Sequence, residues 1–112
     1  MWLLFVDGKC HYNQNDCEHD PTTVRLIKDQ VLAGVDIHYW WTQFSIAGYY
    51  GNEAEGEKIK KLGPDARKEA FRNYYDIIKP QKVIPFASYM YFCKESNQFL
   101  NKWHVSLREL VD

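Results

Sequence analysis

Hydrophobic positions in this chain fall into short runs separated by turn-forming residues. The first run is continuous, from Met1 to Val6, and Asp7-Gly8 closes it. An uninterrupted apolar run of this length predicts either a strand buried on both faces or a buried strand at the centre of a sheet. Asp7-Gly8-Lys9 is typical of a hairpin turn, so we expect Cys10 to Gln14 to return as a second strand.

Asp20 and Pro21 mark the start of the first predicted helix. Aspartate is a favoured N-cap residue, and proline fits the first helical position. Gly34 stands where a glycine commonly ends a helix. The stretch from Val35 to Phe44 is rich in β-branched and aromatic side chains and predicts a strand. Hydrophobic residues at helical spacing define one face of the helix before it: Val24, Ile27 and Val31.

The rest of the chain predicts a loop, two helices and one strand. Ser45 to Lys61 holds three of the six glycines and is interpreted as a loop. Lys82 to Ala87 predicts a short buried strand, interrupted at Pro85. Ser96 to Val111 predicts a last helix, with a stripe of Phe99, Trp103, Leu107 and Leu110. The clearest helix begins at Gly63-Pro64-Asp65 and ends at Pro80, with these residues on one face: Ala66, Ala70, Phe71, Tyr74, Ile77 and Ile78.

The predicted order β-β-α-β-α-β-α indicates an α/β fold built on a layered sheet. The length of 112 residues favours one domain. No element precedes the first apolar strand to cover or pair with it. We therefore expect residues 1–112 to form a single partial domain, part of a larger sheet.

Composition and charge exclude several classes of protein. The net charge is −1, from 14 Lys and Arg against 15 Asp and Glu, so no overall field favours nucleic acid or an anionic membrane. Three cysteines, an odd number, and no signal-peptide pattern argue against a disulfide framework and favour a cytoplasmic protein. Aromatic residues make up 16% of the chain, which suggests an aromatic surface for a partner, for a pocket or for a missing half of the domain.

The densest group of polar side chains is NQNDCEHD, Asn13 to Asp20. Asp16 follows a predicted strand, and strand ends in α/β sheets are where ligand-binding groups collect. Asp16, His19 and Asp20 carry donors that suit Zn, Fe or Mn, yet zinc needs three or four protein ligands and one loop rarely supplies them. Cys17 fits a thiolate ligand, a nucleophile or a buried, inert thiol, and the last is favoured because no nearby cation clearly activates it. The segment is therefore either part of a metal site or a loop with Asp20 as a helix cap.

Other candidate groups favour packing over chemistry. His38 lies within an aromatic strand and His104 follows Trp103 in the last predicted helix, so we expect both to pack rather than to bind a metal. The sequence contains no phosphate-binding glycine loop, no CxxC, no HExxH and no nucleophile elbow.

Three stretches of the chain resemble a known family. LLFVDGKCHYNQNDC, VDIHYWWTQFSIAGYYGN and KPQKVIPFASYMYFC resemble successive blocks in the C-terminal half of metallo-β-lactamase-fold proteins. The nearest branch is that of CMP-N-acetylneuraminate hydroxylase-type and related metal-dependent hydrolase-like proteins. The resemblance implies an αββα sandwich, of which this chain supplies the C-terminal half. It also implies that Asp16 is a ligand that bridges two metal ions, zinc or iron.

This sequence departs from the family pattern in its other metal ligands. The HxHxDH motif is absent, and no histidine occupies the block IPFAS. The resemblance therefore implies a chain inactive alone, whose metal ligands must be completed by another chain. That partner would be a companion N-terminal half or a further copy of the chain. The alternative is a non-catalytic interaction module that uses an aromatic surface.

Overall fold

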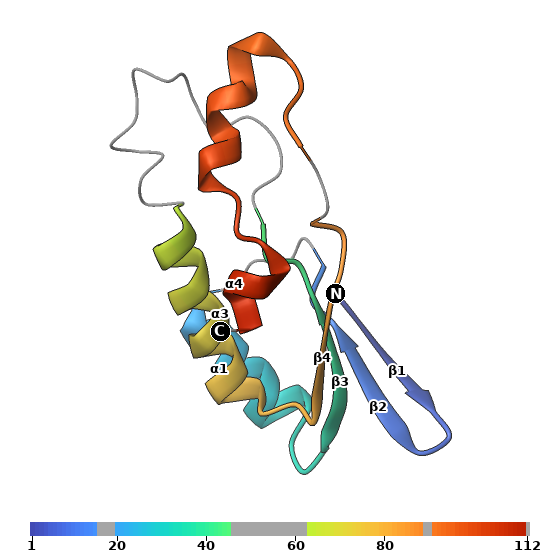
Figure 1. Ribbon diagram of the computed structural model, residues 1–112. Coiled ribbons are helices and arrows are strands. Elements are labelled where there is room, and N and C mark those ends of the chain that lie inside the picture. Colours follow the sequence, from blue (N-terminus) through green and yellow to red (C-terminus); the bar gives the residue numbers. More distant parts are fainter. Residues whose placement is uncertain (16–19, 46–62, 89–90, 112) are drawn as a thin grey trace.

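The computed structural model describes residues 1–15, 20–45, 63–88 and 91–111, and its fold is mixed α/β. Four strands form one sheet in the order β1-β2-β3-β4 (Figure 1). β1 and β2 are antiparallel, whereas β2, β3 and β4 run parallel to one another. The strands are β1 (Trp2–Val6), β2 (Lys9–Asn13), β3 (Ile37–Thr42) and β4 (Lys82–Pro85). The helical segments are α1 (Pro21–Leu26), η1 (Ile27–Val31), α3 (Pro64–Ile78), η3 (Glu95–Trp103) and α4 (Leu107–Val111).

The predicted hairpin is confirmed, but the predicted burial of its first strand is wrong. Asp7 and Gly8 both have positive φ, 50° and 73°, as a two-residue hairpin turn requires. β1 lies at the edge of the sheet, and most of its side chains are exposed, up to 61% at Phe5. Only Leu3 packs against the core. The physical reason is topological: a hairpin adds β1 outside β2, and a continuous apolar run does not distinguish an edge strand from a central one.

Asp20 caps α1 as predicted. Its Oδ1 accepts hydrogen bonds from the backbone N–H of Thr22 at 2.8 Å and of Thr23 at 3.1 Å. The helix then widens in η1, where the N–H of Leu32 donates to the carbonyl of Ile27, five residues earlier. The wider turn brings Leu32 into the core and leaves Val31 60% exposed, so the predicted placement of Val31 on the buried face is wrong.

β3 contains a bulge at His38. Cys10 pairs with Ile37 and His11 pairs with Tyr39, so one extra residue lies on β3. The backbone N–H of Cys10 donates to His38 Nδ1 at 3.1 Å. Because the bulge shifts the alternation by one residue, Ile37 and Trp40 both enter the same core.

The helix predicted to begin at Gly63-Pro64-Asp65 and to end at Pro80 is confirmed as α3 (Pro64–Ile78). Gly63 is its N-cap, and Lys79 ends it in the left-handed conformation, at φ 48°. Both parallel crossovers place their helices on the same face of the sheet, as right-handed connections between successive strands require (Figure 1). The core between the sheet and these helices consists of Tyr12, Val24, Leu32, Ile37, Trp40 and Ile78.

The single helix predicted from Ser96 to Val111 is wrong. A 3₁₀ helix, η3, ends at Trp103, and His104 is extended, with ψ 141°. Ser106 then starts α4 through a reciprocal cap: its N–H and Oγ donate to Glu109 Oε2, and the N–H of Glu109 donates to Ser106 Oγ. These local hydrogen bonds replace the continuous helical ladder.

Candidate functional site

The candidate metal ligand lies outside the described residues. Asp16, Cys17 and His19 are all in the range 16–19. Asp20 acts as the helix cap, and the hydrogen bond from the Thr23 hydroxyl, first among its contacts, lowers the pKa of its carboxyl group. Within the described ranges, no three His, Cys, Asp or Glu side chains come together as a metal site would require.

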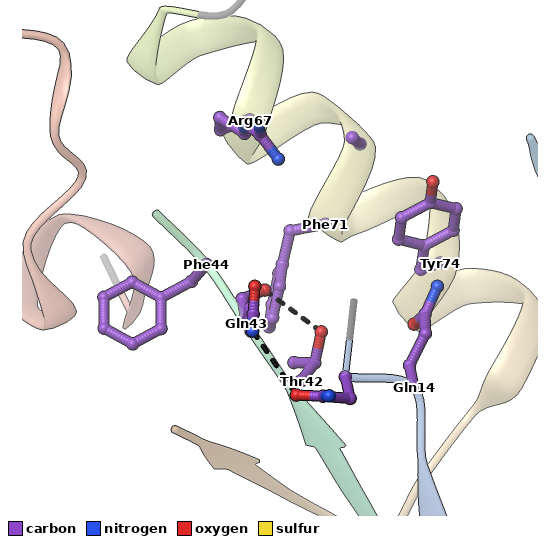
Figure 2. Close-up of a pocket in the computed structure, with 9 residues that line it drawn as sticks. Gln14, Thr42, Gln43, Phe44, Arg67, Phe71 and Tyr74 are labelled. Atoms are coloured by element: carbon purple, nitrogen blue, oxygen red, sulfur yellow. Dashed lines mark hydrogen bonds between the residues drawn. The ribbon is translucent and has the colours of Figure 1, made fainter. Parts of the chain in front are cut away.

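A small pocket lies at the carboxyl ends of β2 and β3. Figure 2 shows side chains of α3, including Arg67 and Phe71, facing the ends of these strands. The cavity measures about 60 Å³, which is room for a few water molecules and far below the size of a metabolite site. It is lined by Gln14, Asn15, Thr42, Gln43, Phe44, Arg67, Ala70, Phe71 and Tyr74.

Polar groups around this pocket bind one another. Gln14 Oε1 accepts a 3.1 Å hydrogen bond from the indole N–H of Trp40, which satisfies a donor inside the core. Gln43 Nε2 donates to Asn15 Oδ1 at 3.3 Å. These hydrogen bonds therefore satisfy polar groups where the two strands end.

A serine and a histidine meet where β3 ends. Ser45 Oγ and His104 Nδ1 form a hydrogen bond, and the ring of Phe92 stacks on His104 with centroids 5.3 Å apart. Desolvation lowers the pKa of His104, so its imidazole is neutral at pH 7. His104 Nε2 has no hydrogen-bond partner among the described residues, so no third group orients the ring as in a catalytic triad. His104 therefore packs against Phe92, and its hydrogen bond to Ser45 joins the end of β3 to the segment after η3.

A further candidate surface is the face of the sheet opposite the helices, which we call the open face. α1, α3 and α4 lie on the other side of the sheet (Figure 1). Residues paired across neighbouring strands share a face, and Tyr12 and Trp40 identify the face toward the core. The pairings therefore place on the open face Trp2, Leu4, Val6, Lys9, His11, Asn13, Tyr39, Trp41, Lys82 and Ile84.

Aromatic side chains on the open face contact one another. His11 stacks on Tyr39 at 4.5 Å and accepts a 3.3 Å hydrogen bond from the indole N–H of Trp41. Phe86 contacts the Trp41 ring edge-on, at 6.1 Å. These contacts hold the rings in a fixed array across β2 and β3. On β1 the neighbouring side chains are about half exposed: Trp2 46%, Leu4 50% and Val6 44%.

Sequence reasoning found this surface only in part. The aromatic content suggested a partner surface, but core packing remained the alternative for the stretch His38-Tyr39-Trp40-Trp41. The structure divides that stretch: Trp40 is fully buried, whereas Tyr39 and Trp41 lie on the open face. The continuous apolar run of β1 shows no alternation in the sequence, and the bulge at His38 that fixes the phase of β3 was not visible there either.

Comparisons with protein-family models, with curated proteins and with solved structures give no match. In the described part of the chain, every helix is too short or too polar to cross a membrane.

Proposed function

We propose that this chain is a protein-interaction module that docks the open face of its sheet onto an apolar β-sheet of another polypeptide. The open face itself is the observation that carries this proposal. β2, β3 and β4 are parallel, and parallel sheets are normally covered on both faces. Here, within the described residues, helices cover one face only. Exposed apolar side chains gathered on such a face, here Trp2, Leu4 and Val6, are characteristic of an interaction site.

The chemistry of the open face favours a sheet as the partner. Its charged residues are two lysines, Lys9 on β2 and Lys82 on β4, and it carries no carboxylate. The rings of Tyr39 and Trp41 lie side by side along β3, where a second pleated surface can interdigitate with them at the usual spacing of about 10 Å. Nucleic acid would instead require a basic surface, and the chain has a net charge of −1.

A second candidate function builds on the same surface. One βα layer with a bare sheet face is half of an αββα sandwich, the architecture implied by the resemblance to metallo-β-lactamase-fold proteins. In this proposal the chain is the C-terminal half of a metal-dependent hydrolase. Asp16 would contribute one zinc or iron ligand, and the docked chain would contribute the others. The favouring observation is that Asn15 and Asp20, which flank Asp16–His19, lie beyond the carboxyl end of β2.

Two adjacent residues on β1 provide a matched test of the interaction proposal. Leu4 and Phe5 are both well exposed, 50% and 61%, but their side chains lie on opposite faces. A photocrosslinking amino acid placed at either position in the full chain, in cells, samples the two faces separately. We expect a discrete covalent adduct from position 4 and little from position 5. Equal labelling at both positions, or none at position 4, would overturn the proposal.

A further inference from the structure

We propose that the pocket at the carboxyl ends of β2 and β3 binds a carboxylate group, with Arg67 as its counterion and the side-chain amide of Gln14 as a hydrogen-bond donor. The pocket lies between the strand ends and α3, on the helix side of the sheet (Figure 2). This inference is therefore independent of the open face and of the function proposed for it. β2 and β3 are parallel, and ligands of α/β sheets bind beyond the carboxyl ends of such strands.

Gln14 carries the first step, because one end of its buried amide has a partner and the other end faces the pocket. The side chain is 3% exposed, and its Oε1 accepts a 3.1 Å hydrogen bond from the indole N–H of Trp40. An indole N–H is a donor only, so this bond fixes which end of the amide is the oxygen. The Nε2 group is thereby turned toward Tyr74 of α3, and it has no acceptor among the described residues (Figure 2). An acceptor bound in the pocket would satisfy these two N–H groups.

Arg67 supplies the charge that selects an anion. Among the described residues that line the pocket, it is the one charged side chain, and none is acidic. A guanidinium group has five N–H donors in a planar fork, so it can hold a carboxylate through two hydrogen bonds while it keeps other contacts. One positive charge balances a carboxylate, whereas a phosphate group at pH 7 carries a larger negative charge. The donor set therefore favours a carboxylate.

The size and the walls of the pocket limit how much of the ligand enters. A cavity of about 60 Å³ has room for a carboxylate on a short stem but not for a whole metabolite. Phe44, Ala70 and Phe71 form apolar walls beside the polar groups. Such walls exclude water and strengthen the attraction between Arg67 and the anion. The ligand is thus either a small free acid or the carboxylate end of a larger molecule that lies outside.

The direct test is a titration of the isotope-labelled full chain with sodium acetate, followed by NMR, with sodium chloride replaced stepwise to keep the ionic strength constant. We expect the side-chain NH₂ signals of Gln14 and the Nε–H signal of Arg67 to shift along one saturable curve. The dissociation constant should lie in the millimolar range, because the ligand has few atoms to contribute binding energy.

Three variants locate the site. Arg67→Gln should raise the dissociation constant at least about tenfold through loss of the charged hydrogen bonds. Arg72→Gln removes the same charge from an exposed position of α3 outside this pocket, and should leave binding unchanged. Gln14→Glu keeps an acceptor for Trp40 and places a carboxylate where the NH₂ group stood, beside Arg67. It should abolish acetate binding, and circular dichroism establishes that each variant folds.

A second probe distinguishes the two sources of the carboxylate. An N-acetylated dipeptide with a free terminal carboxylate is compared with its amidated form and with acetate. Tighter binding of the free dipeptide than of acetate supports the inference and identifies a polypeptide end, and tighter binding of acetate supports it and identifies a small acid. The inference is overturned if no signal saturates, which would mean that the pocket holds water only. It is equally overturned if Arg67→Gln binds acetate as the wild type does, or if inorganic phosphate binds more tightly than acetate.

Discussion

Ser45 Oγ and His104 Nδ1 form a hydrogen bond that ties the end of β3 to the segment between η3 and α4. The two residues lie 59 positions apart, and the bond is partly buried. Ser88, which follows β4, binds the same end of β3, since its hydroxyl accepts hydrogen bonds from the N–H groups of Phe44 and Ser45. The C-terminal segment is thus attached to the sheet through a neutral imidazole.

The first prediction is that stability falls as the pH drops below about 6.5, the ordinary pKa of histidine. Desolvation lowers the pKa of His104 in the folded chain, so the unfolded chain binds the proton more readily. The stability that neutral His104 contributes is complete above pH 6.5, and it is lost as the pH falls through the pKa of His104 in the folded chain. Glu109 is the charged residue that lines the same hollow as His104. Urea melts between pH 7.5 and 5 measure the effect.

His104→Gln is the control for this prediction, because it removes the titrating group and should flatten the dependence over that interval. Asp20 and Glu109 titrate at lower pH, since hydrogen bonds lower the pKa of both carboxyl groups. Their loss of stability therefore falls below about pH 4.5 and is separable from that of His104. If the free energy of unfolding depended on pH in His104→Gln as it does in the wild type, the effect would belong to another group.

The second prediction concerns the cap of α1. Asp20→Ala should lower the free energy of unfolding by about 1 kcal/mol, because it leaves the N–H groups of Thr22 and Thr23 without their acceptor. Asp20→Asn keeps a hydrogen-bond acceptor, so its free energy of unfolding should fall much less. Asp29→Ala removes an exposed acid within η1 and controls for charge alone. Denaturant melts at pH 7 compare the three variants; equal losses from Asp20→Ala and Asp29→Ala would contradict the capping role.

The third prediction is that the isolated chain takes up zinc or iron weakly or not at all. Asp16 is the one ligand that the resemblance implies, and a stable zinc site needs three or four. Isothermal titration calorimetry with zinc should show no tight, stoichiometric uptake. Asp16→Ala should then cost little stability but abolish any activity of an assembled enzyme. Tight uptake by the chain alone would contradict the prediction and direct attention to Cys17 and His19.

Local sequence signals predicted the helix and turn boundaries that are set by the preferences of individual side chains. The turn at Asp7-Gly8, the cap at Asp20 and the helix between Pro64 and Pro80 all follow from side-chain preferences that act over a few residues. The break in the last helix had such a signal too: Ser106 and Glu109 form the spacing of a capping box. The hydrophobic stripe across the break concealed it, because both halves are amphipathic.

The sequence did not predict the features that depend on tertiary contacts. The wide turn of η1 exchanges Val31 for Leu32 in the core, and the apolar pattern alone accommodates either residue. The edge position of β1 depends on where the crossovers place β3 and β4, far along the chain. The two candidate sites differ in the same way. Asp16 was indicated by its residue type and its place after a strand, whereas the open face can be identified only once the register of the four strands is known.

The last prediction tests the bulge that sets this register. His38→Ala removes the acceptor of the Cys10 N–H and should destabilise the fold by about 1 kcal/mol. His38→Asn retains an acceptor and should recover part of the loss. Deletion of His38 should cost much more, because regular alternation would withdraw either Ile37 or Trp40 from the core. Denaturant melts rank the three variants, and tryptophan fluorescence reports whether Trp40 stays buried. If the deletion were no worse than His38→Ala, the bulge would not be what brings both residues into one core.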